Sequence, residues 1–117
     1  MRETADLRQW QDAGVLHEAE STMGYMWECP DFFTLNGKRV LMFSPQGMQA
    51  AGFSNRNLFQ SGYLIGEWQP GQRFIRHGEF REMDNGHDFY APQSFATPDG
   101  RRIVIGWLDM WESPLPE

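Results

Sequence analysis

The sequence contains little of what a disulfide-bonded, membrane-spanning or nucleic-acid-binding protein needs. A single cysteine, Cys29, excludes an internal disulfide framework and a zinc site built from several cysteines. No apolar run approaches the roughly 20 residues of a membrane-spanning helix, and residues 1–6 are polar, unlike a signal peptide. The 10 basic and 16 acidic side chains give a formal net charge of −6, without a basic cluster for nucleic acid or an anionic membrane. We therefore expect a cytoplasmic protein that binds neither nucleic acid nor membrane.

Signals for helix are scarce as well. Thr4 can cap a helix, and Leu7 and Trp10 form an apolar pair at helical spacing, which is enough for about one turn. Gly14 and Gly24 then break the pattern. The sequence therefore predicts at most one short helical turn near the N-terminus.

The rest of the chain favours β-structure, and its aromatic content of 15% is high for this length. Two pairs of β-prone runs are separated by turn residues: 31–35 and 38–44 by Asn36-Gly37, and 94–97 and 101–107 by Pro98-Asp99-Gly100. Asn-Gly is a strong hairpin signal because both residues tolerate positive φ. Two further candidate strands, 60–68 and 72–78, follow a polar loop at 44–58.

The two predicted hairpins look like copies of one unit. Their turn glycines, Gly37 and Gly100, are 63 residues apart. At this offset three residues meet identical partners: Phe32 and Phe95, Thr34 and Thr97, and Arg39 and Arg102. Repeated antiparallel units of this size are typical of propeller blades, each a four-stranded sheet. Two blades cannot close a ring, and a small antiparallel sandwich with accidental similarity is the alternative.

Glu28 is the leading candidate for chemistry. Under the repeat alignment it matches Ala91, so only the first copy carries a carboxylate just before its hairpin. Trp27 and Cys29 flank it, and poorly solvated surroundings favour the protonated form that a general acid needs. Because the inner strands of a propeller line its central channel, we interpret Glu28 as a glycosidase-type acid/base. An exposed glutamate at a strand end is the alternative.

Three further residues are candidates for sugar binding. Asp88 and Tyr90 precede the second hairpin as Glu28 precedes the first, and Trp107 ends an apolar strand. Aromatic faces can stack on sugar rings, and carboxylates accept hydrogen bonds from hydroxyl groups. The alternative for Tyr90 and Trp107 is that they fill the core between blades.

Signals for a metal or a cofactor are weak. The three histidines, His17, His77 and His87, are far apart and lack partners at ligand spacing. Cys29 has no neighbouring histidine, which favours a buried structural thiol over a nucleophile. No phosphate-binding glycine loop occurs. We therefore predict neither a metal site nor a cofactor.

Residues 27–33, Trp-Glu-Cys-Pro-Asp-Phe-Phe, resemble the Glu-Cys motif of glycoside hydrolase family 32, which contains invertases, levanases and sucrose-6-phosphate hydrolases. Five other blocks resemble the family in the same order: 6–10, 44–47, 60–63, 88–93 and 101–107. The resemblance covers nearly the whole chain, from residue 6 to residue 107, and six ordered blocks make it highly specific.

The resemblance implies a five-bladed β-propeller followed by a β-sandwich. Family members cleave β-fructofuranosides with retention of configuration, using an aspartate nucleophile, a glutamate acid/base and an aspartate that stabilises the transition state. Glu28 matches the acid/base. Four residues fall in blocks that approach the fructosyl pocket, where the resemblance implies substrate binding: Cys29, Asp88, Tyr90 and Trp107.

The chain also departs from the family pattern. It contains neither the Trp-x-Asn-Asp-Pro-Asn-Gly segment of the nucleophile nor the Arg-Asp-Pro motif of the stabilising aspartate. Its length suits about two blades: residues 1–22 are expected to end the second blade, about 23–80 to form the third and about 81–117 the fourth. We expect a fragment that is inactive alone and forms homo-oligomers through exposed blade faces. The alternatives are a sugar-binding or structural remnant, or one half of a complementing split enzyme.

Overall fold

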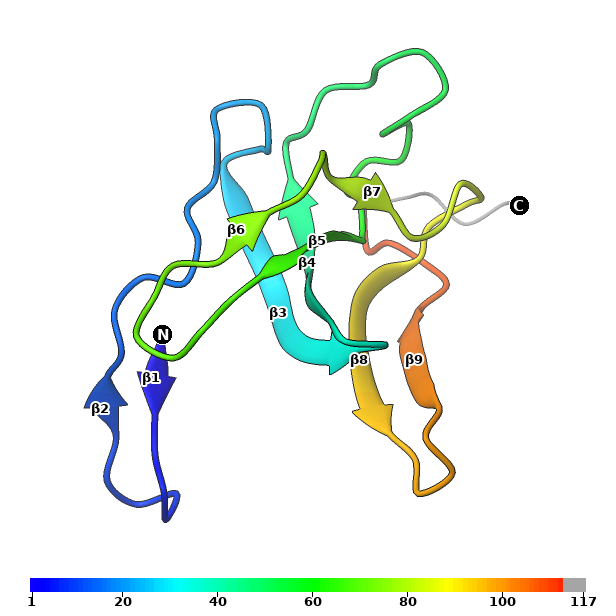
Figure 1. Cartoon of the computed structure of the whole chain (residues 1–117). Coiled ribbons are helices and arrows are strands. Elements are labelled where there is room, and N and C mark those ends of the chain that lie inside the picture. Colours follow the sequence, from blue (N-terminus) through cyan, green and yellow to red (C-terminus); the bar gives the residue numbers. More distant parts are fainter. Residues whose placement is uncertain (113–117) are drawn as a thin grey trace.

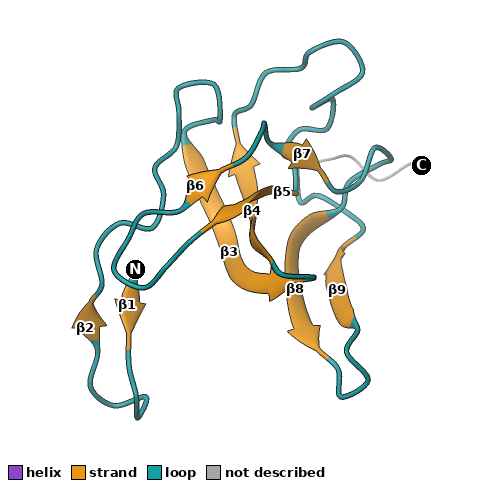
Figure 2. Ribbon diagram, viewed as in Figure 1, coloured by secondary structure: helices purple, strands orange, loops and turns teal. Residues whose placement is uncertain are grey.

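The computed structural model describes residues 1–112, and within them the chain is built from β-strands without helices (Figures 1 and 2). The strands are β1 (Arg2–Glu3), β2 (Gln11–Asp12), β3 (Met26–Leu35), β4 (Lys38–Gln46), β5 (Gly62–Glu67), β6 (Ile75–Arg76), β7 (Arg81–Glu82), β8 (Tyr90–Ala96) and β9 (Arg102–Trp107). All their pairings are antiparallel. The predicted all-β class is confirmed, and the part of the chain that the structure describes contains no helix that could cross a membrane.

The main sheet has the layout of a propeller blade. Its strands follow chain order, β3-β4-β5-β6, and β7 also pairs with β5. β6 pairs with Gly66 and Glu67, while β7 pairs with Gly62 and Tyr63, so the two short strands lie against opposite ends of β5. The sheet is therefore four strands wide, as expected for one blade.

Both predicted hairpins are present. Asn36 and Gly37 have φ values of 48° and 76°, which the tight turn between β3 and β4 requires. The β8–β9 hairpin closes through Gly100, whose N–H donates to the Thr97 carbonyl at 3.0 Å. Figure 1 shows this second hairpin beside the main sheet.

Strand β4 is buried on both faces, and each face packs against a different part of the molecule. Leu41 and Phe43 point into the core of the main sheet, where they are 4% and 0% exposed. Trp27 stacks on Phe43 with ring centroids 3.9 Å apart. Val40 and Met42 lie on the opposite face and, together with Val104 of β9, line a groove between the two hairpins. Because successive side chains of β4 point to opposite faces, one face packs in the core of the main sheet and the other faces the β8–β9 hairpin.

A polar cluster also links the two hairpins. The Asp31 carboxylate accepts hydrogen bonds from the backbone N–H of Ser94, at 3.0 Å, and from the Ser94 hydroxyl. Arg102 Nε donates to Ser94 Oγ at 2.8 Å, and the guanidinium lies 3.7 Å from the centre of the Phe33 ring. Because Asp31 belongs to β3 and Ser94 to β8, this cluster fixes the second hairpin against the first.

The predicted N-terminal helical turn is wrong. Thr4 does accept backbone hydrogen bonds, from Asp6 at 3.2 Å and Leu7 at 3.0 Å, as a capping residue would. However, Leu7 adopts a φ of 61°, which a right-handed helix does not allow, and the chain turns back to pair β2 with β1.

The two strands predicted between the hairpins are shorter than expected. The candidate strand 60–68 becomes β5, and the candidate strand 72–78 reduces to β6. Just before β6, the N–H of Phe74 donates to the carbonyl of Leu16 at 2.8 Å, outside the sheet. This backbone contact keeps Phe74 out of the ladder, so β6 begins at Ile75 and consists of Ile75–Arg76.

Candidate active site

Each of the two hairpins contains a β-bulge, and Glu28 lies at the bulge of the first hairpin. The ladder register shifts after Glu28 in β3 and after Tyr90 in β8. The next residues, Cys29 and Ala91, have nearly the same positive φ, 48° and 49°. Glu28 therefore corresponds to Tyr90 and not to Ala91. Gly100 follows Tyr90 by ten positions but Gly37 follows Glu28 by nine, and the extra length lies in the turn, which is longer after β8 (97–101) than after β3 (36–37). The predicted alignment of Glu28 with Ala91 is wrong by one residue.

The bulges bring Glu28 and Tyr90 into direct contact. The Tyr90 hydroxyl donates to Glu28 Oε2 at 2.6 Å. Gln46 Nε2 donates to the same carboxylate oxygen at 3.1 Å and to the Tyr90 oxygen at 3.0 Å. The amide oxygen of Gln46 accepts a hydrogen bond from the Tyr25 hydroxyl at 3.1 Å. One oxygen of Glu28 therefore accepts hydrogen bonds from two donors. Each donor is fixed by a further hydrogen bond, Tyr90 by Gln46 and Gln46 by Tyr25.

Tyr90 is suited to remain a donor. Its side chain is 2% exposed, and burial, followed by the hydrogen bond to Glu28, raises its pKa well above the ordinary value of 10.0. The phenol therefore keeps its proton at any pH near neutrality. Gln46, which is 6% exposed, presents its amide N–H groups toward Glu28 and Tyr90.

An aromatic hollow of about 380 Å³ lies beside this cluster. Its lining residues come from β8, β9 and the segment that follows: Tyr90, Ala91, Trp107, Asp109 and Trp111. Trp107 and Trp111 are 71% and 65% exposed, and the Trp111 ring lies 5.4 Å from that of Tyr90. Exposed indole faces together with a carboxylate are the surface features on which a sugar can stack and form hydrogen bonds.

The structure brings together some of the predicted site residues. Trp107 pairs directly with Tyr90 across the β8–β9 ladder, and Tyr90 contacts Glu28. Cys29 is half-buried and shapes the bulge next to Glu28. Asp88, half-buried with a φ of 33°, lies just before β8 and is not part of the lining of the aromatic hollow.

Sequence reasoning gave no role to Gln46 or Trp111. Gln46 belongs to block 44–47 and is a polar residue at the end of the apolar run of β4. A polar residue at that position could have indicated a functional role, but only the β3–β4 pairing shows that the Gln46 amide reaches Glu28.

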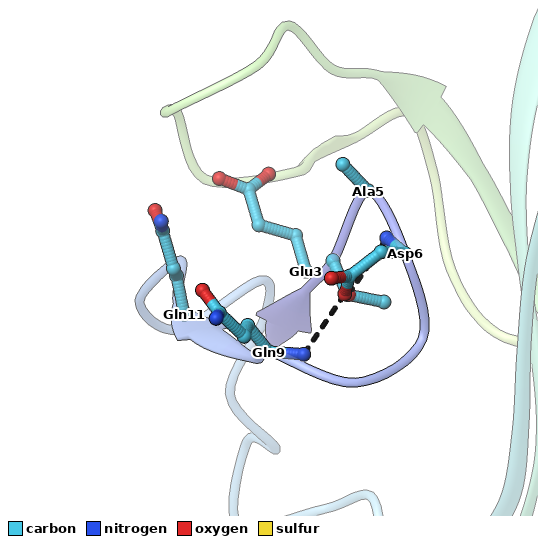
Figure 3. A pocket seen from close by; sticks show the side chains of 6 residues that line it. Glu3, Ala5, Asp6, Gln9 and Gln11 are labelled. Atoms are coloured by element: carbon cyan, nitrogen blue, oxygen red, sulfur yellow. Dashed lines mark hydrogen bonds between the residues drawn. The ribbon is translucent and has the colours of Figure 1, made fainter.

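A second hollow of about 400 Å³ lies at the loop of the β1–β2 hairpin (Figure 3). The Asp6 carboxylate, which lines this hollow, accepts hydrogen bonds from the backbone N–H groups of Gln9 and Arg8 at 2.9 and 2.8 Å. These bonds lower the pKa of Asp6. Asp6 therefore stabilises the turn and is not a candidate catalytic group. In residues 1–112, no group of three or more His, Cys, Asp or Glu side chains is placed to hold a metal ion.

Comparison with known proteins gives consistent matches over the whole chain. The model of the glycosyl hydrolases family 32 N-terminal domain matches residues 1–117. A sucrose-6-phosphate hydrolase of Escherichia coli is 62% identical over 112 residues, which cover 96% of this chain and 24% of that enzyme. A raffinose invertase of Escherichia coli is 54% identical over 110 residues, covering 94% and 23%. The chain thus spans about a quarter of the length of the curated relatives it matches.

Solved structures agree with the sequence matches. A family 32 β-fructofuranosidase of Bombyx mori superposes with a TM-score of 0.90 at 45% identity, over 97% of this chain and 24% of the enzyme. A variant of that enzyme in complex with sucrose gives the same values. The fold is therefore part of the β-propeller of this family. The family match over the full chain, the high identities and the shared structure together show that this chain belongs to glycosyl hydrolase family 32.

Proposed function

We propose that this chain supplies the general acid/base, Glu28, of a retaining β-fructofuranosidase that acts on sucrose or sucrose-6-phosphate. The observation that carries the proposal is the contact of Glu28 Oε2 with both Tyr90 and Gln46, beside an aromatic hollow. The matched relatives are sucrose-6-phosphate hydrolases and an invertase, and sucrose is bound in the Bombyx mori variant. We propose a cytoplasmic location as well.

Glu28 can perform both proton transfers of the reaction. In the first step its carboxyl group protonates the glycosidic oxygen of the leaving sugar, and in the second it removes a proton from water. Tyr90 and Gln46 fix Oε2, so Oε1 is the oxygen that exchanges the proton with the substrate. Because Tyr90 keeps its own proton, it orients the carboxylate without competing for the transferred proton.

Retention also requires a second carboxylate, about 5–5.5 Å from the first, that attacks the anomeric carbon. The sequence contains neither aspartate motif of the family. We therefore propose that the nucleophile and the stabilising aspartate come from another polypeptide segment, and that this chain alone does not hydrolyse sucrose.

Trp107 provides the sugar platform in this proposal, and Cys29, Asp88 and Tyr90 surround the fructosyl unit. Residues 1–22 end the second blade of the propeller, and the main sheet forms the third. Because β7 pairs with β5, the third blade extends to Glu82, and the β8–β9 hairpin starts the fourth.

Co-expression with a family 32 fragment that carries the two aspartate motifs tests the proposal. Sucrose hydrolysis should appear only in the mixture, and Glu28→Gln should lower it by about 10²- to 10⁴-fold, the usual contribution of general acid–base catalysis. A fructoside with an acidic leaving group needs no protonation in the first step, so its cleavage rate should fall much less. Glu67→Gln, at a glutamate that is 73% exposed, is the matched control and should leave the rate unchanged. Hydrolysis by the pure chain alone, lost in Glu28→Gln, would contradict the proposal.

The aromatic hollow favours a second candidate function, a sugar-binding module without catalysis. Trp107 is exposed and lines the hollow, so Trp107→Ala removes a stacking surface without opening the core. Calorimetry with fructose and with sucrose should then show binding by the unmodified chain and its loss in Trp107→Ala. Binding that persists in a mixture without hydrolytic activity would favour this second function over the first.

A further inference from the structure

We propose that Tyr25 is a positioning residue that directs the acidic proton of Glu28 toward the substrate by fixing the side-chain amide of Gln46. Because Glu28 is the general acid only in the proposed function, the role of Tyr25 rests on that proposal. Gln46 lies between the two groups. Its amide oxygen accepts a hydrogen bond from the Tyr25 hydroxyl at 3.1 Å, and its amide nitrogen donates to Glu28 Oε2 at 3.1 Å.

The backbone holds Tyr25 against Gln46. The Tyr25 N–H donates to the Gln46 carbonyl at 2.9 Å. Glycines on both sides permit this close approach: a Cβ on Gly24 would lie 2.1 Å from the Gln46 carbonyl oxygen. Likewise, a Cβ on Gly47 would lie 2.4 Å from Cδ1 of the Tyr25 ring. The main chain and the side chain of Gln46 are therefore both bound to Tyr25.

The Gln46 amide needs to be fixed because its two acceptors lie on the same side of it. The amide nitrogen, Glu28 Oε2 and the Tyr90 oxygen form a triangle with sides of 3.1, 3.0 and 2.6 Å. The two N–H bonds of an amide point roughly 120° apart, so they cannot both aim straight at these two oxygens. The rotation of the amide therefore decides whether Glu28 or Tyr90 receives the better-aligned N–H.

The Tyr25 hydroxyl restrains that rotation. It binds the amide oxygen, at the opposite end of the group from Glu28. Gln46 is only 6% exposed, so water has little access to replace a lost partner. A donor on the amide oxygen also polarises the amide and strengthens its N–H groups as donors. Removal of the hydroxyl should thus loosen the amide and weaken its hydrogen bond to Glu28.

The hydrogen bond from Gln46 affects which oxygen of Glu28 carries the proton. While Oε2 accepts the N–H of Gln46 and the O–H of Tyr90, its lone pairs are engaged and a proton there is disfavoured. The acidic proton then lies on Oε1, the oxygen that exchanges it with the substrate in the proposed function. If the bond from Gln46 is lost, Oε2 can hold the proton away from the substrate. Tyr25 should therefore affect protonation of the leaving group and not binding of the sugar.

Kinetics of Tyr25→Phe test this role in the mixture with the fragment that carries the two aspartate motifs. For sucrose, kcat should fall about 3- to 10-fold, as expected for the loss of one hydrogen bond, and KM should stay the same. For a fructoside with an acidic leaving group, kcat/KM should be nearly unchanged. Tyr63→Phe is the matched control, because it removes a phenol hydroxyl from β5 at the groove between the two hairpins. It should leave the rates of both substrates unchanged.

Three kinetic results overturn the role of Tyr25. They are an unchanged kcat for sucrose, a rise in KM alone, which would indicate direct contact with the sugar, and an equal fall for both substrates, which would indicate a general loss of structure. Glu28→Gln in the same mixture reports on the proposed function by itself. If Glu28→Gln leaves the sucrose rate unchanged, the proposed function fails, whatever Tyr25→Phe shows.

Nuclear magnetic resonance of the chain alone tests the positioning step without an activity assay. The side-chain amide protons of Gln46, assigned by their loss in Gln46→Ala, should exchange with solvent about 3- to 10-fold faster in Tyr25→Phe, because a hydrogen bond that fixes the amide is gone. Tyr63→Phe should leave this exchange unchanged. Equal exchange rates in Tyr25→Phe and the unmodified chain overturn the inference even if the mixture is inactive.

Discussion

Replacement of Asp31 by alanine should separate the second hairpin from the main sheet more than any comparable surface change. Asp31 is the common acceptor for the backbone N–H and hydroxyl of Ser94, and its other oxygen lies 3.8 Å from Arg102 Nη2. The side chains of Asp31 and Arg102 are only 16% and 17% exposed. The carboxylate is therefore well shielded from water, and its removal leaves groups on β8 and β9 without their partner.

The magnitude follows from these contacts. A hydrogen bond to a charged group contributes about 1.5–3 kcal/mol net, and two such bonds are lost. The two bonds share one acceptor oxygen and come from the same residue, Ser94, so their contributions do not simply add. We expect Asp31→Ala to lower the free energy of unfolding by about 2–4 kcal/mol, against roughly 5–15 kcal/mol for a typical domain.

Urea unfolding followed by circular dichroism measures this effect. Asp31→Asn should lose about 1–2 kcal/mol, because the amide oxygen still accepts a hydrogen bond but the charge is gone. Asp99→Ala is the matched control, because it also removes an aspartate from an arginine pair, but an exposed one. Its effect should be much smaller, since water screens exposed pairs.

Two results would contradict this account of the Asp31 cluster. The first is an Asp31→Ala midpoint equal to that of the unmodified chain, with the same dependence on urea. The second is an equal loss in Asp99→Ala, which would mean that burial of the Asp31 cluster adds nothing. A double-mutant cycle with Arg102→Ala should further show coupling between Asp31 and Arg102.

Two more predictions follow from buried groups. Because the pKa of Tyr90 is raised on folding, the unfolded chain loses this proton first, so the stability that Tyr90 contributes should be fully present below about pH 10 and decrease as pH rises above it. Tyr90→Phe should therefore show a shallower decrease in alkaline unfolding curves, and parallel curves would contradict this. Gly66→Ala should destabilise the fold by about 1–3 kcal/mol, because the added Cβ would lie 2.1 Å from the Ile75 carbonyl oxygen. Thermal unfolding measures this loss, and an unchanged midpoint would show that β6 moves aside freely.

Elements that depend on local preferences could be predicted from the sequence. Asn36-Gly37 and Gly100 place the hairpin turns because their backbones adopt positive φ at little cost, and the structure has both turns. The apolar run of β4 likewise predicts a buried strand. The family could also be predicted, because the short blocks around Glu28 and their order are read directly from the sequence.

Features that depend on contacts between distant segments could not be predicted, because those segments meet only in the folded chain. The bulges after Glu28 and Tyr90 show that these two residues are equivalent, and the strand pairing shows that the one-residue offset of the repeat comes from the longer turn after β8. The same bulges turn Tyr90 toward Glu28, and strand pairing carries Gln46 to both. At the N-terminus, the capping pattern around Thr4 was present but the chain formed a hairpin, since pairing of β1 with β2 replaced helical hydrogen bonds. The register of a sheet depends on the combined interactions of many residue pairs, so the position of the Glu28 cluster is fixed only when the sheet forms.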